Sequence, residues 1–295
     1  MKSRLNARAR ARWDALIGTE GKTLGLDGCR SFLENTHVND IFYGGRFKGV
    51  PCIVKCSSRA PDSILNEAAV GRRLFGADPA VFPEILADFK TADGKMAIVV
   101  TRRIEGPSFY ELVRQPGGIP PAQSDAFAED VLRIAAALHK TGIVHRDINQ
   151  KNLLLDSDGH LKLIDFQFAI DRNAYRETAF MRRNWKYLHV VFGMNRELGV
   201  GRWDDIPPLI YILSQLPPTE TTRNAVKRLE GLGATSMFSA PVPPVVFLWL
   251  RLHAFSLRLR LLLHPSGERS DRLRYRLKTV MDAIEIHCRE RGHSA

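Results

Sequence analysis

Val144-His145-Arg146-Asp147-Ile148-Asn149-Gln150-Lys151-Asn152 is the most informative stretch of the chain, and Leu163-Ile164-Asp165-Phe166 follows soon after it. Three side chains in these two stretches have chemistry that suits phosphoryl transfer. The Asp147 carboxylate can accept a proton from an attacking hydroxyl. Asn152 and Asp165 carry hard oxygen ligands, which magnesium prefers. These three residues are therefore candidates for proton transfer and for magnesium binding.

This pattern closely resembles the H-R-D-x-x-x-x-N loop and the D-F-G segment of protein-kinase-like enzymes. The resemblance implies an α+β, two-lobed protein-kinase-like fold, with a small β-rich N-lobe, a mainly helical C-lobe and ATP in the cleft. It also implies an ATP- and Mg-dependent kinase, which transfers phosphate to an alcohol group. Asp147 would be the catalytic base, and Asn152 and Asp165 would bind both cofactor and metal. The alternative for Asp147 is a buried structural carboxylate paired with arginine.

Two residues upstream complete the expected cofactor site. Lys55 ends the apolar run Ile53-Val54-Lys55 and resembles the V-A-I-K lysine that holds the α- and β-phosphates. Glu67 lies twelve positions later, in a predicted helix, and resembles the glutamate that pairs with that lysine. We therefore expect Lys55 and Glu67 to bind the cofactor together.

Two basic residues of the loop, Lys151 and Arg146, have separate expected roles. Lys151 lies four positions after Asp147, where some tyrosine kinases carry an arginine near the transferring phosphate. We expect Lys151 to be catalytic by supplying positive charge there, with a solvated lysine as the alternative. Arg146 is expected to be structural, bound to an acidic or phosphorylated partner or to a local carboxylate.

Three departures from the kinase pattern point to one branch of the superfamily. No glycine occurs between residues 33 and 40, so Asn35, Thr36 or Asn39 would hold the nucleotide, or it would be held weakly. Gln167 replaces the glycine after Asp165-Phe166, and a basic, Trp-containing segment at 182–188 stands where A-P-E is absent. These features resemble the lipopolysaccharide core kinases, which include the Kdo and heptose kinases. The resemblance implies a sugar hydroxyl of the lipopolysaccharide inner core as acceptor, and it covers roughly residues 30–200. The alternatives are a protein serine/threonine kinase and an ATP-binding pseudokinase or scaffold.

Composition constrains partners and location. The 295 residues carry a net charge of +11, which favours anionic partners. We expect ATP, then an anionic glycolipid or a protein acceptor, and no specific nucleic acid, because no aromatic-interleaved binding motif is visible. Four cysteines form no C-x-x-C pair, and the basic N-terminus lacks the apolar core of a secretory signal. A cytoplasmic protein is expected, with peripheral contact at the cytoplasmic face of the inner membrane as an option.

Turn signals and apolar periodicity divide the chain into three parts. They are a basic N-terminal extension at 1–29, an N-lobe at 30–104, and a C-lobe with a basic helical tail at 105–295. Strands are predicted at 31–33, 41–43, 51–56, 85–89, 96–101, 153–155 and 161–164, with a turn at Gly44-Gly45. Helices are predicted at 62–75, capped by Asp62, and at 124–140, with Gly142 just beyond. Glu105-Gly106-Pro107 is the expected hinge.

The tail is rich in leucine and arginine. Residues 245–263 are expected to form either a helix at a membrane interface or a C-lobe core helix whose arginines reach the surface. No apolar run of 18 uncharged residues occurs, so no spanning helix is expected. A basic run follows, which would suit phosphorylated lipid A or form a solvated face: Arg269, Arg272, Arg274, Arg276 and Lys278.

Overall fold

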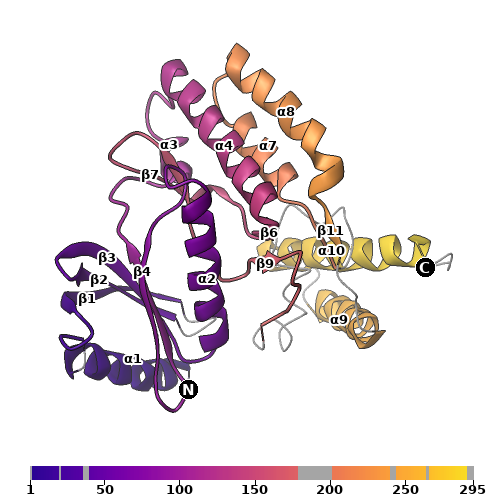
Figure 1. Cartoon of the computed structure of the whole chain (residues 1–295). Helices are drawn as coiled ribbons and strands as arrows, with labels where there is room; N and C mark the ends of the chain where they lie inside the picture. Colours follow the sequence, from indigo (N-terminus) through magenta and orange to yellow (C-terminus); the bar gives the residue numbers. More distant parts are fainter. Residues whose placement is uncertain are drawn as a thin grey trace.

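An antiparallel sheet with strand order β1-β2-β3-β5-β4 forms the N-lobe (Figure 1). The computed structural model describes residues 2–19, 21–35, 40–178, 201–239, 244–263 and 266–290. The strands are β1 (Leu26–Asn35), β2 (Asp40–Phe47), β3 (Val50–Ser57), β4 (Ile85–Lys90) and β5 (Ala97–Arg102). Together with the helices that follow, this sheet confirms the predicted two-lobed α+β fold.

The turn predicted at Gly44-Gly45 is wrong. Both glycines lie inside β2, where Gly45 is paired with Cys52 of β3, and the chain turns at Lys48-Gly49 instead. A Cβ at Gly45 would lie 2.6 Å from the Cys29 sulfur. Gly45 therefore permits β1 to approach β2 closely. In the sequence, a glycine needed for such close packing looks the same as a glycine needed for a turn.

Two helices cover opposite faces of the sheet, because successive side chains of a strand alternate in direction. Helix α1 (Lys2–Thr19) buries Trp13 and Ile17 in the cluster that contains Ile98 and Val100 of β5. Helix α2 (Pro61–Ala77) packs on the other face, against Ala97 and Val99 of the same strand and against Ile85 of β4.

These helices change two details of the expected organisation. Tyr43 of β2 donates a hydrogen bond to Asp14 of α1 over 2.8 Å, so the basic N-terminal segment is bound to the sheet. The expected boundary between residues 29 and 30 falls inside β1.

Asp62 does not cap α2, because Ala60 occupies the cap position and Pro61 begins the helix. Asp62 lies in the first turn of α2, where its negative charge stabilises the helix by interacting with the helix dipole.

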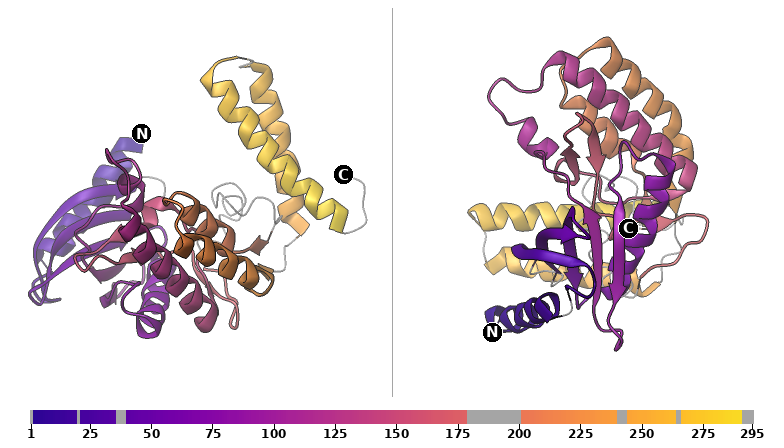
Figure 2. Two further views of the ribbon diagram at one scale, coloured as in Figure 1. Left: turned by 90° about the horizontal axis from the view of Figure 1, so that it is seen from above. Right: turned by 60° about the vertical axis from the view of Figure 1, so that its left-hand side comes forward.

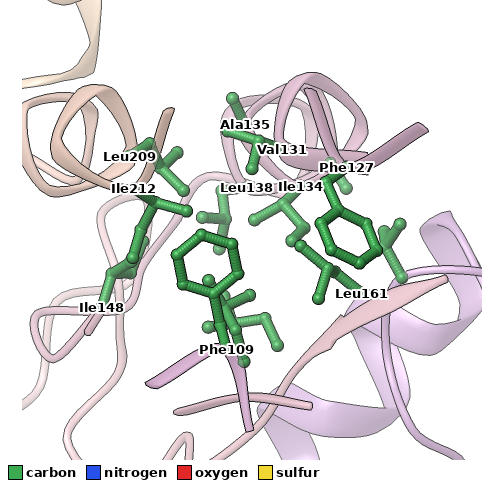
Figure 3. Packing of buried hydrophobic residues seen from close by; sticks show 14 of the residues in the cluster. Phe109, Phe127, Val131, Ile134, Ala135, Leu138, Ile148, Leu161, Leu209 and Ile212 are labelled. Carbon is green, nitrogen blue, oxygen red and sulfur yellow. The ribbon is translucent and has the colours of Figure 1, made fainter. Parts of the chain in front are cut away.

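The C-lobe is mainly helical, as expected, and Figure 3 shows part of its core. Phe109, Phe127, Ile134, Leu209 and Ile212 are among its fully buried side chains. They come from α3 (Phe109–Leu112), α4 (Pro121–Thr141) and α7 (Ile206–Ser214), and α8 (Glu220–Ser236) packs beside α4 and α7. Helix α4 ends at Gly142, which has the left-handed φ of 70° that glycine tolerates.

Short strands lie before and after the loop at 145–152, which carries the predicted site. The hairpin of β7 (Leu153–Leu155) and β8 (Leu161–Leu163) confirms the sequence prediction, and β6 (Ile143–Val144) pairs with β9 (Ile170–Asp171). At the hinge, a Cβ on Gly106 would lie 1.9 Å from the Leu155 carbonyl oxygen. Glycine is therefore needed where the hinge crosses β7.

Helices α9 (Pro244–Leu263) and α10 (Glu268–Glu290) form a hairpin that lies to one side of the C-lobe (Figure 2). The hairpin has a core of its own, which includes Leu250, Leu257, Leu273 and Val280. Among the described residues, no helix is long and apolar enough to cross a membrane. Strands β10 (Arg202–Trp203) and β11 (Phe238–Ser239) pair antiparallel.

Candidate active site

The predicted catalytic loop connects β6 to a short 3-10 helix, η1 (Gln150–Asn152). Asp205, at the start of α7, accepts hydrogen bonds from the backbone N–H groups of His145 (2.6 Å) and Arg146 (3.0 Å). Burial, the largest effect, raises the pKa of Asp205 to about 6. The His145 ring bonds to the Ile164 carbonyl over 3.0 Å, so the loop is also tied to the chain before Asp165.

Arg146 binds a local carboxylate, one of the alternatives that the sequence left open. Its guanidinium forms a bidentate ion pair with Glu177, with N–O distances of 2.5 and 3.1 Å. It also donates to the Phe168 carbonyl and lies over the Trp203 ring, 4.9 Å from the ring centroid. Both charged side chains are almost fully buried, so the pair holds residues 166–177 against the catalytic loop.

Replacing Glu177 with alanine should therefore destabilise the protein by about 3–5 kcal/mol, because a buried arginine would lose its counter-charge. Urea denaturation followed by fluorescence measures this change. Glu84→Ala is the matched control, because Glu84 pairs with Arg102 at the surface and such pairs contribute about 0–1 kcal/mol. Equal effects of the two substitutions would contradict the structural role of the buried pair.

Asp147 is not paired with arginine in the described contacts; two asparagines bind its carboxylate instead. Asn152 donates to Oδ2 over 3.2 Å and Asn149 donates to Oδ1 over 3.3 Å. Burial, followed by the negative charge of Asp165, raises the Asp147 pKa to about 7, although the two asparagine bonds oppose the shift. A carboxyl group with this pKa can exchange a proton near neutral pH.

Lys55 joins the two lobes through a three-residue ion cluster. Its ammonium lies 2.8 Å from Glu67 of α2 and 2.9 Å from Asp165, which follows β8. Burial lowers the Lys55 pKa, but the carboxylates of Asp165, Glu67 and Asp40 together raise it above its usual value. Lys55 therefore stays charged, and it presents a fixed cation between the lobes.

The two acidic partners of Lys55 differ in their protonation. Burial raises the pKa of Glu67 to about 7, against the smaller opposing effect of Lys55. Burial also acts to raise the pKa of Asp165. The charge and the hydrogen bond of Lys55 outweigh this effect and hold the Asp165 pKa below its usual value. Asp165 is therefore the more acidic carboxylate of the cluster.

The donor set fits a magnesium ion that is shared with a nucleotide. Asp165 supplies an ionised carboxylate, and Asn152 supplies an amide whose nitrogen is already bound to Asp147. Among the described residues, no group of three or more His, Cys, Asp or Glu side chains could hold a metal alone. Magnesium that keeps water and phosphate ligands needs only one or two protein ligands.

Lys151 is placed differently from the other predicted residues. Its side chain is exposed and its ammonium lies 5.1 Å from the centroid of the Tyr110 ring in α3. Its backbone N–H binds the Asn149 side chain over 2.9 Å, which shapes η1. The structure thus puts Lys151 beside the catalytic loop, without a contact to Asp147 among the described interactions.

Sequence reasoning missed three buried acidic residues. Asp205 and Glu177 hold the catalytic loop from 60 and 31 positions downstream. Asp40 begins β2 and lies buried near Lys55, with a pKa that burial raises to about 6. For Asp205 alone the sequence held a local signal: the Asp204-Asp205 pair precedes Pro207-Pro208, a pattern typical of the start of a helix.

Two of the expected features lie outside the described residues. One is the group proposed for nucleotide binding, since nothing is described of the Asn35 side chain or of Thr36 and Asn39. The other is the basic, Trp-containing segment at 182–188. Their predicted roles stay predictions.

Part of the chain is similar in sequence to protein kinases. Residues 57–187 match the family described as Protein kinase domain. The serine/threonine-protein kinase PknL of Mycobacterium tuberculosis is 40% identical over 74 residues, which is 25% of this chain and 18% of that protein. A probable cAMP-dependent protein kinase catalytic subunit of Encephalitozoon cuniculi is 30% identical over 112 residues, 38% of this chain and 34% of that protein. The chain thus spans about a fifth to a third of the length of these relatives.

Proposed function

Because the chain has the protein-kinase-like fold, we propose that it is an ATP- and magnesium-dependent phosphotransferase that acts on a hydroxyl group. One observation carries the proposal. The ion cluster of Lys55, Glu67 and Asp165 lies beside the bonded pair of Asp147 and Asn152. Ile164, next to Asp165, donates to the Asn152 carbonyl over 2.9 Å, and the charge of Asp165 acts on Asp147. These groups offer a cation for phosphate, oxygen ligands for magnesium and a base for the acceptor, which is the set that phosphoryl transfer requires.

Each residue of the set has a proposed task. Lys55 binds the α- and β-phosphates, and Glu67 orients its ammonium. Asn152 and Asp165 would hold magnesium, which would neutralise charge on the phosphates of ATP, the donor of the phosphoryl group. Asp147 orients the acceptor hydroxyl and takes its proton as the new oxygen–phosphorus bond forms and the bond to ADP breaks. Lys151 adds positive charge near the transferred group, and most of the rate gain comes from positioning and electrostatics.

The acceptor hydroxyl is proposed from the comparisons. The relatives named above are protein kinases, which favours a serine or threonine hydroxyl of a protein. The second candidate is a sugar hydroxyl of the lipopolysaccharide inner core. The exposed apolar and basic surface of α9 favours it, because a lipid-linked acceptor lies at a membrane. A cytoplasmic location, where ATP is available, fits either acceptor.

Transfer of labelled phosphate tests the proposal directly. The protein is incubated with labelled Mg-ATP and either a generic basic protein or Kdo–lipid A, while ADP release is measured in parallel. Label in the basic protein supports a protein kinase, and label in the lipid supports the second candidate. ATP binding without ADP release on any acceptor would contradict an enzyme and favour a pseudokinase or scaffold.

The pH profile should report the protonation of Asp147. Its carboxyl group is neutral below the pKa of about 7 and cannot accept a proton, so kcat/KM should fall about tenfold per pH unit below that value. Above it, kcat/KM should level off. Initial rates across both sides of neutral pH measure this.

Glu67 has a pKa in the same range and needs a control. A Glu67→Gln variant cannot titrate at this position. If Asp147 controls the profile, the variant is slower but keeps the acidic limb. Loss of that limb would assign the titration to Glu67 instead.

A further inference from the structure

Helix α9 carries a stripe of exposed apolar side chains. Five of them recur at alternating steps of four and three positions and are 50% to 78% exposed: Leu248, Leu252, Phe255, Leu259 and Leu262. Because an α-helix has 3.6 residues per turn, this spacing puts all five on one face. Leu263, at the end of the helix, widens the same face.

The stripe is not the face that holds the hairpin together. Leu250, Ala254 and Leu257 point the other way, into the core that α9 shares with α10. The hairpin therefore already has its core, and the exposed stripe is additional apolar surface. Protein surfaces seldom expose such a contiguous patch unless it binds something.

The charges around the stripe decide which partner fits. Arg251 and Arg258 are exposed along one flank, and Arg260 is exposed along the other. Helix α9 contains no aspartate or glutamate. On α10, Lys278 and Arg274 are exposed as well, and Arg274 pairs with the exposed Asp271 over 3.6 Å. The apolar face is thus bordered by cations on both sides.

A second copy of this chain is a poor occupant. Packing two α9 stripes together would bring the flanking arginines of one helix against those of the other. Like charges at the flanks of a helix–helix seam destabilise it, and no acidic side chain of α9 could compensate. An anionic surface has the complementary charge.

We propose that the exposed face of α9 docks on a lipid membrane that contains anionic headgroups. The leucines and Phe255 enter the boundary between headgroups and acyl chains, while the arginine stems extend outward to the phosphates. Lys278 of α10 adds attraction to the anionic surface. The helix lies in the plane of the interface, and docking is independent of which hydroxyl the enzyme phosphorylates.

Vesicle sedimentation of the full-length protein, without nucleotide, tests this inference. We expect binding to vesicles of phosphatidylcholine with phosphatidylglycerol and much weaker binding to phosphatidylcholine alone. Leu252→Ser/Phe255→Ser/Leu259→Ser should weaken binding on the order of a hundredfold, because three apolar side chains lose their burial. Arg251→Gln/Arg258→Gln should weaken it on the order of tenfold and reduce its salt dependence.

Two controls keep the experiment decisive. Tyr211→Ser removes an exposed aromatic side chain of α7, and it should bind like the unchanged protein. Thermal unfolding of every variant verifies its fold, which should persist because the replaced side chains of α9 are exposed.

Three results would overturn the inference: equal binding by the triple variant, equal binding to both vesicle types, or no binding at all. Concentration-dependent dimerisation that the triple variant abolishes, measured by light scattering, would assign the face to a protein partner instead. Because the assay contains no ATP, its failure would leave the proposed phosphotransferase untouched, and inactivity of the enzyme would leave the docking result intact.

Discussion

Replacing Asp147 with alanine is expected to reduce turnover on the order of a hundredfold or more, since removal of a general base typically costs this much. The carboxylate is the group that would orient the acceptor and take its proton. Two asparagines of the same loop orient it through hydrogen bonds of 3.2 and 3.3 Å. Initial-rate measurements of phosphate transfer give the value.

Two comparisons make this result specific. Asp147→Asn keeps the size of the side chain and should be as inactive as the alanine variant, because the amide cannot accept the proton. ATP binding, followed by thermal shift, should persist in both variants because none of the described hydrogen bonds or ion pairs joins Asp147 to Lys55. Near-normal turnover in either variant would contradict the assignment of Asp147 as the base.

Replacing Asp165 with alanine is expected to cost more, on the order of a thousandfold in turnover. The charge stabilisation that a bound metal provides is worth several kcal/mol, and each 1.4 kcal/mol corresponds to about tenfold in rate. The variant loses the ionised carboxylate of the predicted metal pair and one of the two ion-pair partners of Lys55. ADP release across a magnesium titration measures both turnover and the apparent metal affinity.

Asp171→Ala is the matched control for this variant. Asp171 lies six positions later, in β9, and pairs with Arg73 at the surface rather than with Lys55. It should keep its magnesium dependence. An Asp165→Ala enzyme that responds to magnesium like the unchanged protein would contradict the metal role, even if its turnover were reduced.

Local sequence patterns identified most of the elements that carry the site. The hairpin of β7 and β8 was predictable because Asp158-Gly159 connects two short apolar runs. Helix α4 was predictable because its apolar face repeats at helical spacing and Gly142 ends it. Both signals depend on residues only a few positions apart, which interact directly whatever the rest of the chain does. The error at Gly44-Gly45 arose because close packing of β1 on Gly45, rather than a local turn, set the geometry there. The error at Asp62 was local, because Pro61 begins the helix one residue earlier.

By itself, the sequence predicted the kind of chemistry and the residues that are proposed to carry it. Asp147, Asn152 and Asp165 belong to one loop and the hairpin that follows it, so local chain geometry keeps these residues close. Only the tertiary structure decided what supports them. Lys55 reaches Asp165 across 110 positions, and Asp205 fixes the catalytic loop from 60 positions away. Trp13 joins the N-terminal helix to the sheet, and the two faces of α9 separate into a buried and an exposed one. Such contacts depend on how folded elements pack and bury charge, a property of the whole chain that no local pattern records.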